Sequence, residues 1–477
     1  MADPAPVPER NVKAGPGTDL EAHEGELYAR HKKVYPREVH GIFATLRWAA
    51  VLVLLGLYYF LPWITWNGRQ SVLFDLPDRK FYIFGWTFWP QDFFYLALLL
   101  IIAALSLFFF TALAGRLWCG YACPQTVWTE VFQWIERKIE GDRSAQMKLA
   151  RSPWTARKIR LRVTKQVAWL LFAFWTGFTF VGFFTPIREL WHEMLAFNLG
   201  PWETFWVIFY GLATYGNAGY LREQVCIYMC PYARFQSAMF DKDTLIISYD
   251  EKRGEPRGKR KKGVDPKEVG LGDCVDCTLC VQVCPTGIDI RNGLQYQCIG
   301  CAACIDACDQ VMEKVGYPKG LIRYTTQNAM EGKPTHILRP RMVVYALLLL
   351  AAFAALMYAI ATRVPMELDV IRDRNALYRN APGGLVENVY NLRLINMSDH
   401  PRTFRIELRG LPEMELINRY GEIEVAPGEL ASIDVQVRVD PVVLKRPVTE
   451  IEFVMTPLDG EDEPLAQPTR FIGPVIR

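Results

Sequence analysis

Twelve cysteines are the residues of this chain best suited to chemistry, and every one lies in a short cluster. Eight of them form two runs with the spacing C-x2-C-x2-C-x3-C: Cys274, Cys277, Cys280 and Cys284, then Cys298, Cys301, Cys304 and Cys308. The other four form two C-x3-C-P pairs, which are Cys119 with Cys123 and Cys226 with Cys230. Because no cysteine is left over for a disulfide or for the core, the pattern predicts a redox or soft-metal protein.

The two long runs have the spacing of bacterial two-cluster ferredoxins, in which the fourth cysteine of each run binds the other cluster. The pattern therefore predicts two [4Fe–4S] clusters. The expected ligands are Cys274, Cys277, Cys280 and Cys308 for the first cluster, and Cys298, Cys301, Cys304 and Cys284 for the second. Asp309 stands where the first run has Pro285, but proline is not a ligand. Zinc is the alternative metal, although structural zinc sites rarely use this three-cysteine spacing.

The C-x3-C pairs are less specific, because residues i and i+4 on one helix face can bind a metal or simply pack as small apolar side chains. Two pairs at matched positions favour a metal site. Four thiolates, with a thioether such as Met229, form a soft site that prefers Cu(I) or an iron–sulfur cluster. Since such a site prefers the reduced ion, it also favours reduction of bound Cu(II). The expected metal-handling thiols are Cys119, Cys123, Cys226 and Cys230.

Five uncharged runs are long enough to position these cysteines at a membrane, since a spanning helix needs about 20 residues. The expected spans are 48–66, 93–113, 167–186, 204–221 and 342–362. A buried core helix is the alternative for any one run, and it is strongest for 204–221. The sequence thus predicts a five-helix transmembrane bundle.

An internal repeat relates the two C-x3-C-P pairs. Cys119 and Cys226 are 107 residues apart, and Tyr121 and Tyr228 match at the same offset. Residues 42–240 are therefore expected to form two helical hairpins, each ending in a pair at the same membrane face. After the first pair, apolar residues at helical spacing predict an amphipathic helix on that surface: Trp128, Val131, Phe132 and Ile135.

Lys and Arg counts predict the orientation, because short cytoplasmic loops are enriched in them. The segment 114–166 carries 11, whereas 67–92 carries three. The tail 1–41 and the linker 241–269 are thus expected in the cytoplasm of a bacterial inner-membrane protein. No removable signal peptide is seen, so the first span is expected to be a retained anchor. The basic run 252–262 could bind nucleic acid, but it is more simply a lipid-facing linker, so no nucleic-acid partner is expected.

The remaining segments predict two extramembrane domains. Residues 270–325 are too few for a large core, so the clusters must organise this ferredoxin-type module. Residues 366–477 carry 13 Lys/Arg and 19 Asp/Glu, which agrees with a place on the opposite, periplasmic side. Alternating apolar residues such as Ile433, Val435 and Val437 predict short antiparallel strands in an all-β sandwich.

These features together resemble the CcoG/FixG/RdxA family, accessory proteins for the assembly of cbb3-type cytochrome c oxidase. The similarity runs essentially end to end and includes short motifs around the cysteines. These motifs are Tyr35-Pro36-Arg37, Trp66-Asn67-Gly68-Arg69-Gln70, Trp89-Pro90-Gln91-Asp92-Phe93-Phe94, Trp118-Cys119-Gly120-Tyr121-Ala122-Cys123-Pro124-Gln125 and Gln297-Cys298-Ile299-Gly300-Cys301.

The resemblance implies five spans, a cytoplasmic two-cluster ferredoxin domain and a periplasmic immunoglobulin-like domain. It also implies a cupric reductase that yields Cu(I) for the oxidase, with Cys119, Cys123, Cys226 and Cys230 as the copper-handling thiols. The partners would be the lipid bilayer, a cytoplasmic electron donor, a copper transporter or chaperone, and oxidase subunits. A homo-oligomer is a further possible assembly. Two alternatives are an electron-transfer subunit of a quinone-linked chain and a non-enzymatic assembly scaffold.

Overall fold

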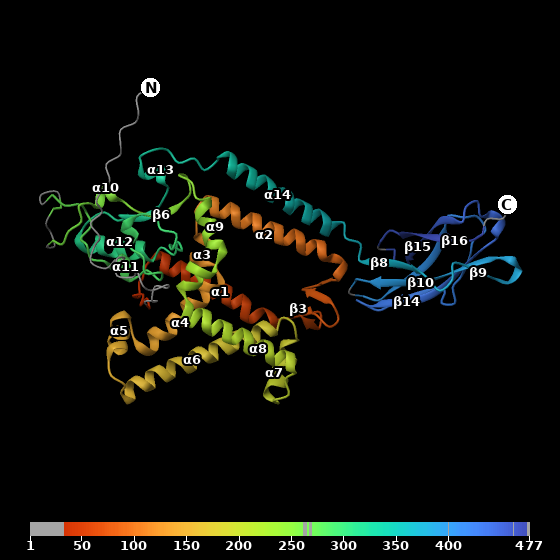
Figure 1. Ribbon diagram of the computed structural model, residues 1–477, viewed down its shortest axis with the longest axis horizontal. Coiled ribbons are helices and arrows are strands. Elements are labelled where there is room, and N and C mark those ends of the chain that lie inside the picture. The colour runs from red at the N-terminus through yellow and green to blue at the C-terminus, as the bar shows by residue number, and fades with distance from the viewer. Residues whose placement is uncertain (1–32, 261–264, 267–269, 399, 461, 475–477) are drawn as a thin grey trace, which may run out of the picture.

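The computed structural model describes residues 33–260, 265–266, 270–398, 400–460 and 462–474. Three parts follow one another along its long axis: a cysteine-rich end, a set of helices, and a β domain (Figure 1). The cysteine-rich end and the β domain therefore lie at opposite ends of the helices.

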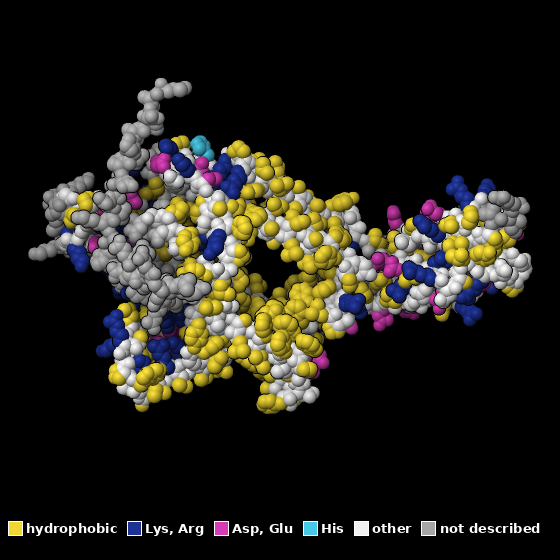
Figure 2. Space-filling view, viewed as in Figure 1, with side chains coloured by type: hydrophobic (Ala, Val, Ile, Leu, Met, Phe, Trp, Pro, Cys, Tyr) yellow, Lys and Arg dark blue, Asp and Glu magenta, His cyan; other side chains and the backbone are white. Residues whose placement is uncertain are grey.

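Three helical segments are long and apolar enough to cross a membrane: Ile42–Trp63, Pro90–Ala114 and Pro340–Ala361. They contain α1 (Ile42–Phe60), α2 (Phe93–Ala114) and α14 (Pro340–Ala361). Hydrophobic side chains cover this middle part of the surface, whereas charged side chains gather toward both ends (Figure 2). Because so much apolar surface needs a hydrocarbon environment, these helices indicate a membrane protein.

The start of α1 differs from the expected run, which began after Arg47. The helix includes Arg47, whose Nη1 donates a hydrogen bond to the carbonyl oxygen of Cys301. The charge of Arg47, which set the start of the expected run, is thus paired with a carbonyl oxygen of the cysteine-rich end. The helix can therefore begin before Arg47.

The other two expected spans are also helical. Among the described residues, however, they are not counted with the three helices that are long and apolar enough to cross a membrane. The first half of α6 (Ala156–Val181) carries several Lys and Arg residues, and α8 (Pro201–Thr214) passes into the π-helix η3 (Tyr215–Leu221). The two helices pack closely, because a Cβ added at Gly177 would lie 2.4 Å from the carbonyl oxygen of Val207. Membrane crossing by α6 and α8 stays a prediction.

The links between the helices contain elements that periodicity did not reveal. Short strands follow α1, in a segment without a strand pattern in the sequence. They form one two-stranded and one three-stranded sheet, made of β1 (Thr65–Trp66) with β2 (Arg69–Gln70), and β3 (Val72–Asp75), β4 (Lys80–Ile83) and β5 (Trp86–Phe88). The helix α7 (Ile187–Leu195) joins α6 to α8.

The helices around the cysteine pairs are shorter than the spans. The first pair belongs to α3 (Leu117–Tyr121) and the start of α4 (Pro124–Glu140), which α5 (Arg143–Arg151) follows. The second pair belongs to the π-helix η4 (Val225–Met229) and the start of α9 (Pro231–Met239). The 107-residue repeat therefore relates the order of the elements but not their local helix type.

The helix α4 differs from the expected surface helix. Its Phe132 is fully buried and packs against Trp169 of α6, with ring centroids 5.4 Å apart. The apolar face predicted for lipid is thus covered by another helix of the same chain.

The cysteine-rich end is organised by two antiparallel strands, β6 (Ile246–Tyr249) and β7 (Ile322–Thr325). Its helices are short except for one: α10 (Glu251–Gly254), α11 (Leu279–Gln282), α12 (Ala303–Val315) and α13 (Gln327–Met330). Part of the expected linker 241–269 therefore belongs to the folded module, because β6 needs β7 as its partner. Residues 261–264 and 267–269 of that expected linker lie outside the described residues.

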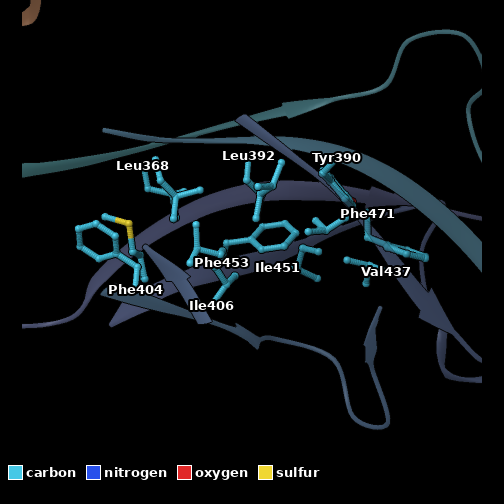
Figure 3. Close-up of a cluster of buried hydrophobic side chains, with 14 of the residues drawn as sticks. Leu368, Tyr390, Leu392, Phe404, Ile406, Val437, Ile451, Phe453 and Phe471 are labelled. Carbon is cyan, nitrogen blue, oxygen red and sulfur yellow. The ribbon is translucent and has the colours of Figure 1, made fainter. Parts of the chain in front are cut away.

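The β domain confirms the predicted antiparallel sandwich. One sheet has the order β12-β14-β10-β8, with β9 also on β10, and the other has the order β13-β11-β15-β16. The strands are β8 (Met366–Arg372), β9 (Arg379–Asn380), β10 (Val386–Asn396), β11 (Arg402–Arg409), β12 (Glu415–Ile417), β13 (Glu422–Val425), β14 (Leu430–Val439), β15 (Val448–Pro457) and β16 (Leu465–Ile472). Inward side chains of both sheets, such as Tyr390 and Phe453, form one core (Figure 3).

Candidate metal centres

The first cavity of the cysteine-rich end is surrounded by thiols from both runs. Cys274, Cys277 and Cys280 of the first run line it together with Cys308 of the second run. Cys280 lies on α11 and Cys308 on α12, so the packing of these two helices brings the runs together. Tyr249 of β6 lines the same cavity.

The second cavity has the complementary set of thiols. Cys298, Cys301 and Cys304 line it together with Cys284 of the first run, and Cys280 also reaches its wall. The structure thus places the fourth cysteine of each run with the first three of the other, as the ferredoxin spacing implies.

The chemistry of these two cavities fits a [4Fe–4S] cluster in each. Burial raises the pKa of Cys280, Cys298 and Cys308 to about 12, so without a metal these thiols would hold their protons in apolar surroundings. Across the described residues, groups of three or more His, Cys, Asp or Glu side chains that could hold a single metal ion are absent. Thiols spread around a cavity, instead of meeting at one point, suit a cubane whose irons each take one thiolate.

Asp309, which departs from the ferredoxin pattern, has a local role. Its Oδ1 accepts a hydrogen bond from the backbone N–H of Gly320, 2.9 Å away. The side chain thereby ties α12 to the turn that leads into β7, where the first run has a proline turn.

The four remaining cysteines, named here the thiol quartet (Cys119, Cys123, Cys226 and Cys230), come from both halves of the repeat. Burial, with smaller contributions from the negative charge that the other three cysteines carry when ionised, raises the pKa of Cys119 to about 12. Burial likewise raises the pKa of Cys226 to about 12, with added contributions from Cys123 and Cys230. Because Cys119 interacts electrostatically with both thiols of the second pair, the two pairs lie in one neighbourhood.

Glutamine side chains connect the two halves of the quartet in a reciprocal way. The Sγ of Cys119 donates to Oε1 of Gln236, 3.1 Å away on the helix that follows the second pair. Conversely, Nε2 of Gln125, which follows the first pair, donates to the carbonyl oxygens of Asn217 (2.9 Å) and Arg222 (3.1 Å) before the second pair. Met229, the thioether considered with these thiols, is 59% exposed, and its part in the site stays a prediction.

The quartet lies directly against the second cavity. A Cβ added at Gly120, between Cys119 and Cys123, would lie 2.7 Å from the carbonyl oxygen of Gly300 and 3.0 Å from the Cα of Cys301. The absence of a side chain at Gly120 therefore lets α3 touch the loop that carries two of the second cavity's thiols.

Arg116 links the same two regions through its buried guanidinium. Its Nη1 donates to the carbonyl oxygen of Cys298, 3.3 Å away, and its Nη2 donates to Ser237 Oγ, 2.6 Å away, and to the carbonyl oxygen of Ala233. One side chain thus joins α3, α9 and the second cavity.

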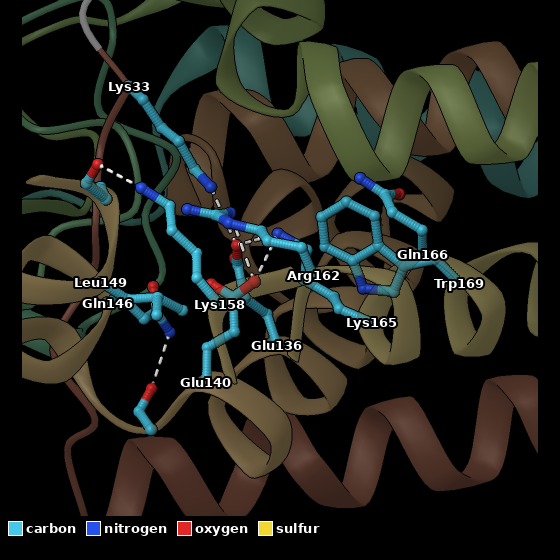
Figure 4. Close-up of polar contacts among 12 residues, drawn as sticks. Lys33, Glu136, Glu140, Gln146, Leu149, Lys158, Arg162, Lys165, Gln166 and Trp169 are labelled. Carbon is cyan, nitrogen blue, oxygen red and sulfur yellow. Dashed lines mark hydrogen bonds and ion pairs between the residues drawn. The ribbon is translucent and has the colours of Figure 1, made fainter. Parts of the chain in front are cut away.

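A buried group of charges supports the segment that leads into the second pair. Glu136 of α4 accepts from Lys33 (2.8 Å), Lys165 (3.2 Å) and Arg222 (2.7 Å), and Lys165 also pairs with Glu140 (2.9 Å). Figure 4 shows Lys33 and Lys165 converging on the two glutamates beside Trp169. Burial alone would raise the pKa of Glu136, but the positive charges of Arg222, Lys33 and Lys165 outweigh it and hold the pKa at about 2.

Several of these residues were not found from spacing alone. Gly120 and Gly300 stood inside motifs that carried the family resemblance, without an assigned role. Arg116 and Arg222 precede the first cysteine of each pair by three and four residues, and this near match was the available signal. Gln236 had no signal, because its partner lies in the other half of the repeat.

Models of two iron–sulfur protein families match the segments that contain the cysteines. Residues 221–327 match a 4Fe-4S dicluster domain, and residues 96–141 match a 4Fe-4S binding domain. The second of these matches contains Cys119 and Cys123. Residues 356–474 match the IG-like fold at the C-terminus of FixG. The chain is therefore an iron–sulfur protein with an immunoglobulin-like domain at its C-terminal end.

Whole-chain relatives carry related names. Protein RdxB of Cereibacter sphaeroides is 42% identical over 413 residues, which is 84% of this chain and 86% of that protein. Nitrogen fixation protein FixG of Rhizobium meliloti is 39% identical over 425 residues, which is 81% of each. A crystal structure of a FixG-related protein from Vibrio parahaemolyticus covers 23% of this chain and 97% of its own, at 31% identity and a TM-score of 0.21.

Proposed function

Because the chain belongs to the FixG/RdxA family, we propose that it is a membrane-bound iron–sulfur oxidoreductase that reduces Cu(II) to Cu(I). The Cu(I) would be supplied for assembly of a cbb3-type cytochrome oxidase, as the family resemblance implies. The observation that carries this proposal is the contact between Gly120 and Gly300, which sets a soft thiol site against a ferredoxin-type cavity.

The resident cofactors would be two [4Fe–4S] clusters, which supply one-electron transfer when bound. Cys274, Cys277, Cys280 and Cys308 would hold one of them, and Cys284, Cys298, Cys301 and Cys304 the other. Tyr249 lines the first cavity, and Arg47 donates a hydrogen bond to the carbonyl oxygen of Cys301 and so holds the backbone beside the second.

Copper is the substrate in this proposal. Thiols of the quartet would bind it, and since no three of these described side chains are arranged around one ion, a pair of thiols is the set that would hold it first. Thiolates are soft ligands that bind Cu(I) more favourably than Cu(II), so the quartet lowers the free energy of the reduced ion. Each Cu(II) ion gains one electron, and a reduced cytoplasmic donor loses one. The thiols must also release their protons on binding, because burial keeps Cys119 and Cys226 protonated in the metal-free protein.

The proposed orientation follows the distribution of basic residues and the shape of the molecule. The cysteine-rich end would lie in the cytoplasm and the β domain in the periplasm of the bacterial inner membrane. The separation of these two parts by three apolar helices supports this arrangement. Cu(I) released at the inner surface would then need a copper transporter or chaperone as its acceptor.

The experiment that tests the proposal replaces Cys226 and Cys230 by serine in anaerobically purified protein. We expect Cu(II) reduction, followed with a Cu(I)-specific chelator, to be lost while the iron and sulfide contents stay at the wild-type level. Tyr228→Phe is the matched control, because Tyr228 lies between the two cysteines and is 68% exposed. Unchanged Cu(II) reduction in the double serine variant would overturn the quartet as the copper site.

A second candidate function is favoured by the match of residues 96–141 to a 4Fe-4S binding domain. If the quartet holds an iron–sulfur cluster, the protein would be an electron-transfer subunit of a quinone-linked chain, and copper would not be its substrate. Iron analysis of the same double serine variant separates the two. Loss of iron beyond the content of the two ferredoxin-type sites favours this second function, and unchanged iron favours copper.

A further inference from the structure

A broad groove lies on the cysteine-rich end beside the first cavity. Its volume is about 1100 Å³. Its lining comes from the segment before the first run, from the run itself, and from α12 and the turn after it: Lys259, Arg260, Val275, Asp276, Cys277, Gln310, Glu313, Lys314, Val315 and Tyr317. Cys277 is the exposed member of the twelve cysteines, all of which lie in the described residues. The groove therefore leads from solution to the edge of the first cysteine set.

The second cysteine set has no comparable approach through this groove, because none of its thiols lines it. Its loop contacts α3, where Gly120 meets Gly300, and the side chain of Arg47, while Cys301 lines a different cavity together with Cys226 of the thiol quartet. The two ends of the cysteine-rich part thus differ: one faces the thiol quartet, and the other faces solution at Cys277.

The charge of the groove is mainly positive. Lys259 and Lys314 are exposed, and Arg260, which also lines the groove, is half-buried. The two acidic groups of the lining already have cationic partners, since Asp276 pairs with Arg291 at 2.6 Å and Glu313 with Lys319 at 3.1 Å. Three basic side chains therefore line the groove, and both acidic side chains of the lining are paired with other cations.

The lining of the groove also includes hydrogen-bonded and apolar side chains. Arg260 donates from Nε to the hydroxyl of Tyr317 (3.0 Å) and from Nη2 to the carbonyl oxygen of Asp273 (2.9 Å). Val275 and Val315 are half-buried beside it. Apolar side chains combined with charged ones are usual in protein–protein interfaces, and electron-transfer contacts are at the small end of the size range.

We propose that this groove docks an acidic, soluble one-electron carrier protein and brings its redox centre to the edge of the first cysteine set at Cys277. The inference deepens the proposed function, because it rests on the need for a cytoplasmic donor. A protein fits better than a small anion, because the groove is wide and open and its basic groups are distributed along it. Opposite charges steer such partners and raise their association rate at low ionic strength.

Binding of an acidic flavodoxin to the intact, cluster-loaded protein in detergent tests the proposal. The variant Lys259→Glu/Lys314→Glu reverses the two exposed charges, and Lys148→Glu/Arg151→Glu is the matched control on α5, away from the groove. We expect the groove variant to weaken binding by roughly tenfold or more at low salt and to flatten its dependence on ionic strength, whereas the control keeps both.

Unchanged affinity in the groove variant, or equal weakening in the control, would overturn the docking site. Failure of flavodoxin to bind the wild type, while inorganic phosphate or a free nucleotide binds at the groove, would overturn it as well. The readout involves no copper, so a protein that binds flavodoxin at the groove but does not reduce Cu(II) would contradict only the proposed function. Iron content of each variant, expected at the wild-type level, shows that the clusters are intact.

Discussion

Gly120 and Gly300 touch through their backbones, and this contact joins the membrane helices to the cysteine-rich end. A Cβ at Gly120 would stand 2.7 Å from the carbonyl oxygen of Gly300, which is closer than real Cβ contacts allow. The contact brings the Cys119 pair and the Cys301 loop together without any intervening side chain.

Gly120→Ala should therefore separate these two regions. The position is helical, so alanine is tolerated by the local backbone, and the steric clash is the main effect. Overpacking of this kind costs about 1–3 kcal/mol, and we expect a lower unfolding temperature together with slower Cu(II) reduction. Gly216→Ala is the control, because nothing lies within 4 Å of the Cβ added there. Equal effects of both substitutions would contradict the contact.

Serine substitutions can test the pairing of cysteines across the two runs. Cys277 and Cys308 line one cavity although they belong to different runs, whereas Cys284 lines the other. Cys277→Ser and Cys308→Ser should each lose one cluster, and the double variant should lose no more iron than either single variant. Cys284→Ser/Cys308→Ser should lose both clusters. Iron analysis and EPR of the reduced proteins give the answer, and additive iron loss for Cys277 with Cys308 would contradict the pairing.

The alternation of apolar residues predicted much of the β domain because a sandwich buries one face of every strand. Ile433, Val435 and Val437 point inward from β14, and Phe453 does so from β15. The sheets after α1 could not be predicted in this way. Their strands have two to four residues, which is too short for a period of two to stand out.

Spacing along the chain predicted the grouping of the ferredoxin-type cysteines, since the order of ligands around a cubane is written into the two runs. The contact of Gly120 with Gly300 could not be predicted, because it depends on how α3 packs on a loop 180 residues away. The environment of Glu136 could not be predicted either. It is buried, and three cations from other segments converge on it.

Glu136→Gln should destabilise the protein because it leaves Arg222 and Lys165 buried with less negative charge. Removing one partner of a buried ion pair costs about 3–5 kcal/mol, and we expect a lower unfolding temperature in detergent. Glu130→Gln on the same helix is the control, because its pair with Arg137 is partly exposed and should contribute about 0–1 kcal/mol.

The pH dependence of that difference follows from the lowered pKa of Glu136. Burial alone would raise it, but Arg222, Lys33 and Lys165 bring the folded value to about 2, below the ordinary 4.5. Ionised Glu136 therefore stabilises the fold from about pH 4.5 up to the pH at which Lys33, whose pKa burial lowers, begins to lose its proton, and this contribution is lost as the pH falls from 4.5 toward 2. Unfolding temperatures of wild type and Glu136→Gln should differ equally at pH 7 and pH 5. A difference that disappears by pH 6 would contradict the assignment.

Arg116→Lys should loosen the junction between the thiol quartet and the second cavity. Lysine keeps the charge, but a single ammonium cannot replace a planar fork that reaches Cys298, Ser237 and Ala233 at once. Losing these charged hydrogen bonds costs about 1.5–3 kcal/mol for each group left unpaired. We expect faster backbone hydrogen exchange in α9 and in the loop around Cys298, with normal exchange in the β domain. Arg341→Lys is the control, because its hydrogen bond goes to Met239 at the end of α9 and not to the cysteine-rich end. Faster exchange in α9 alone, with the Cys298 loop unchanged, would show that Arg116 does not join the two regions.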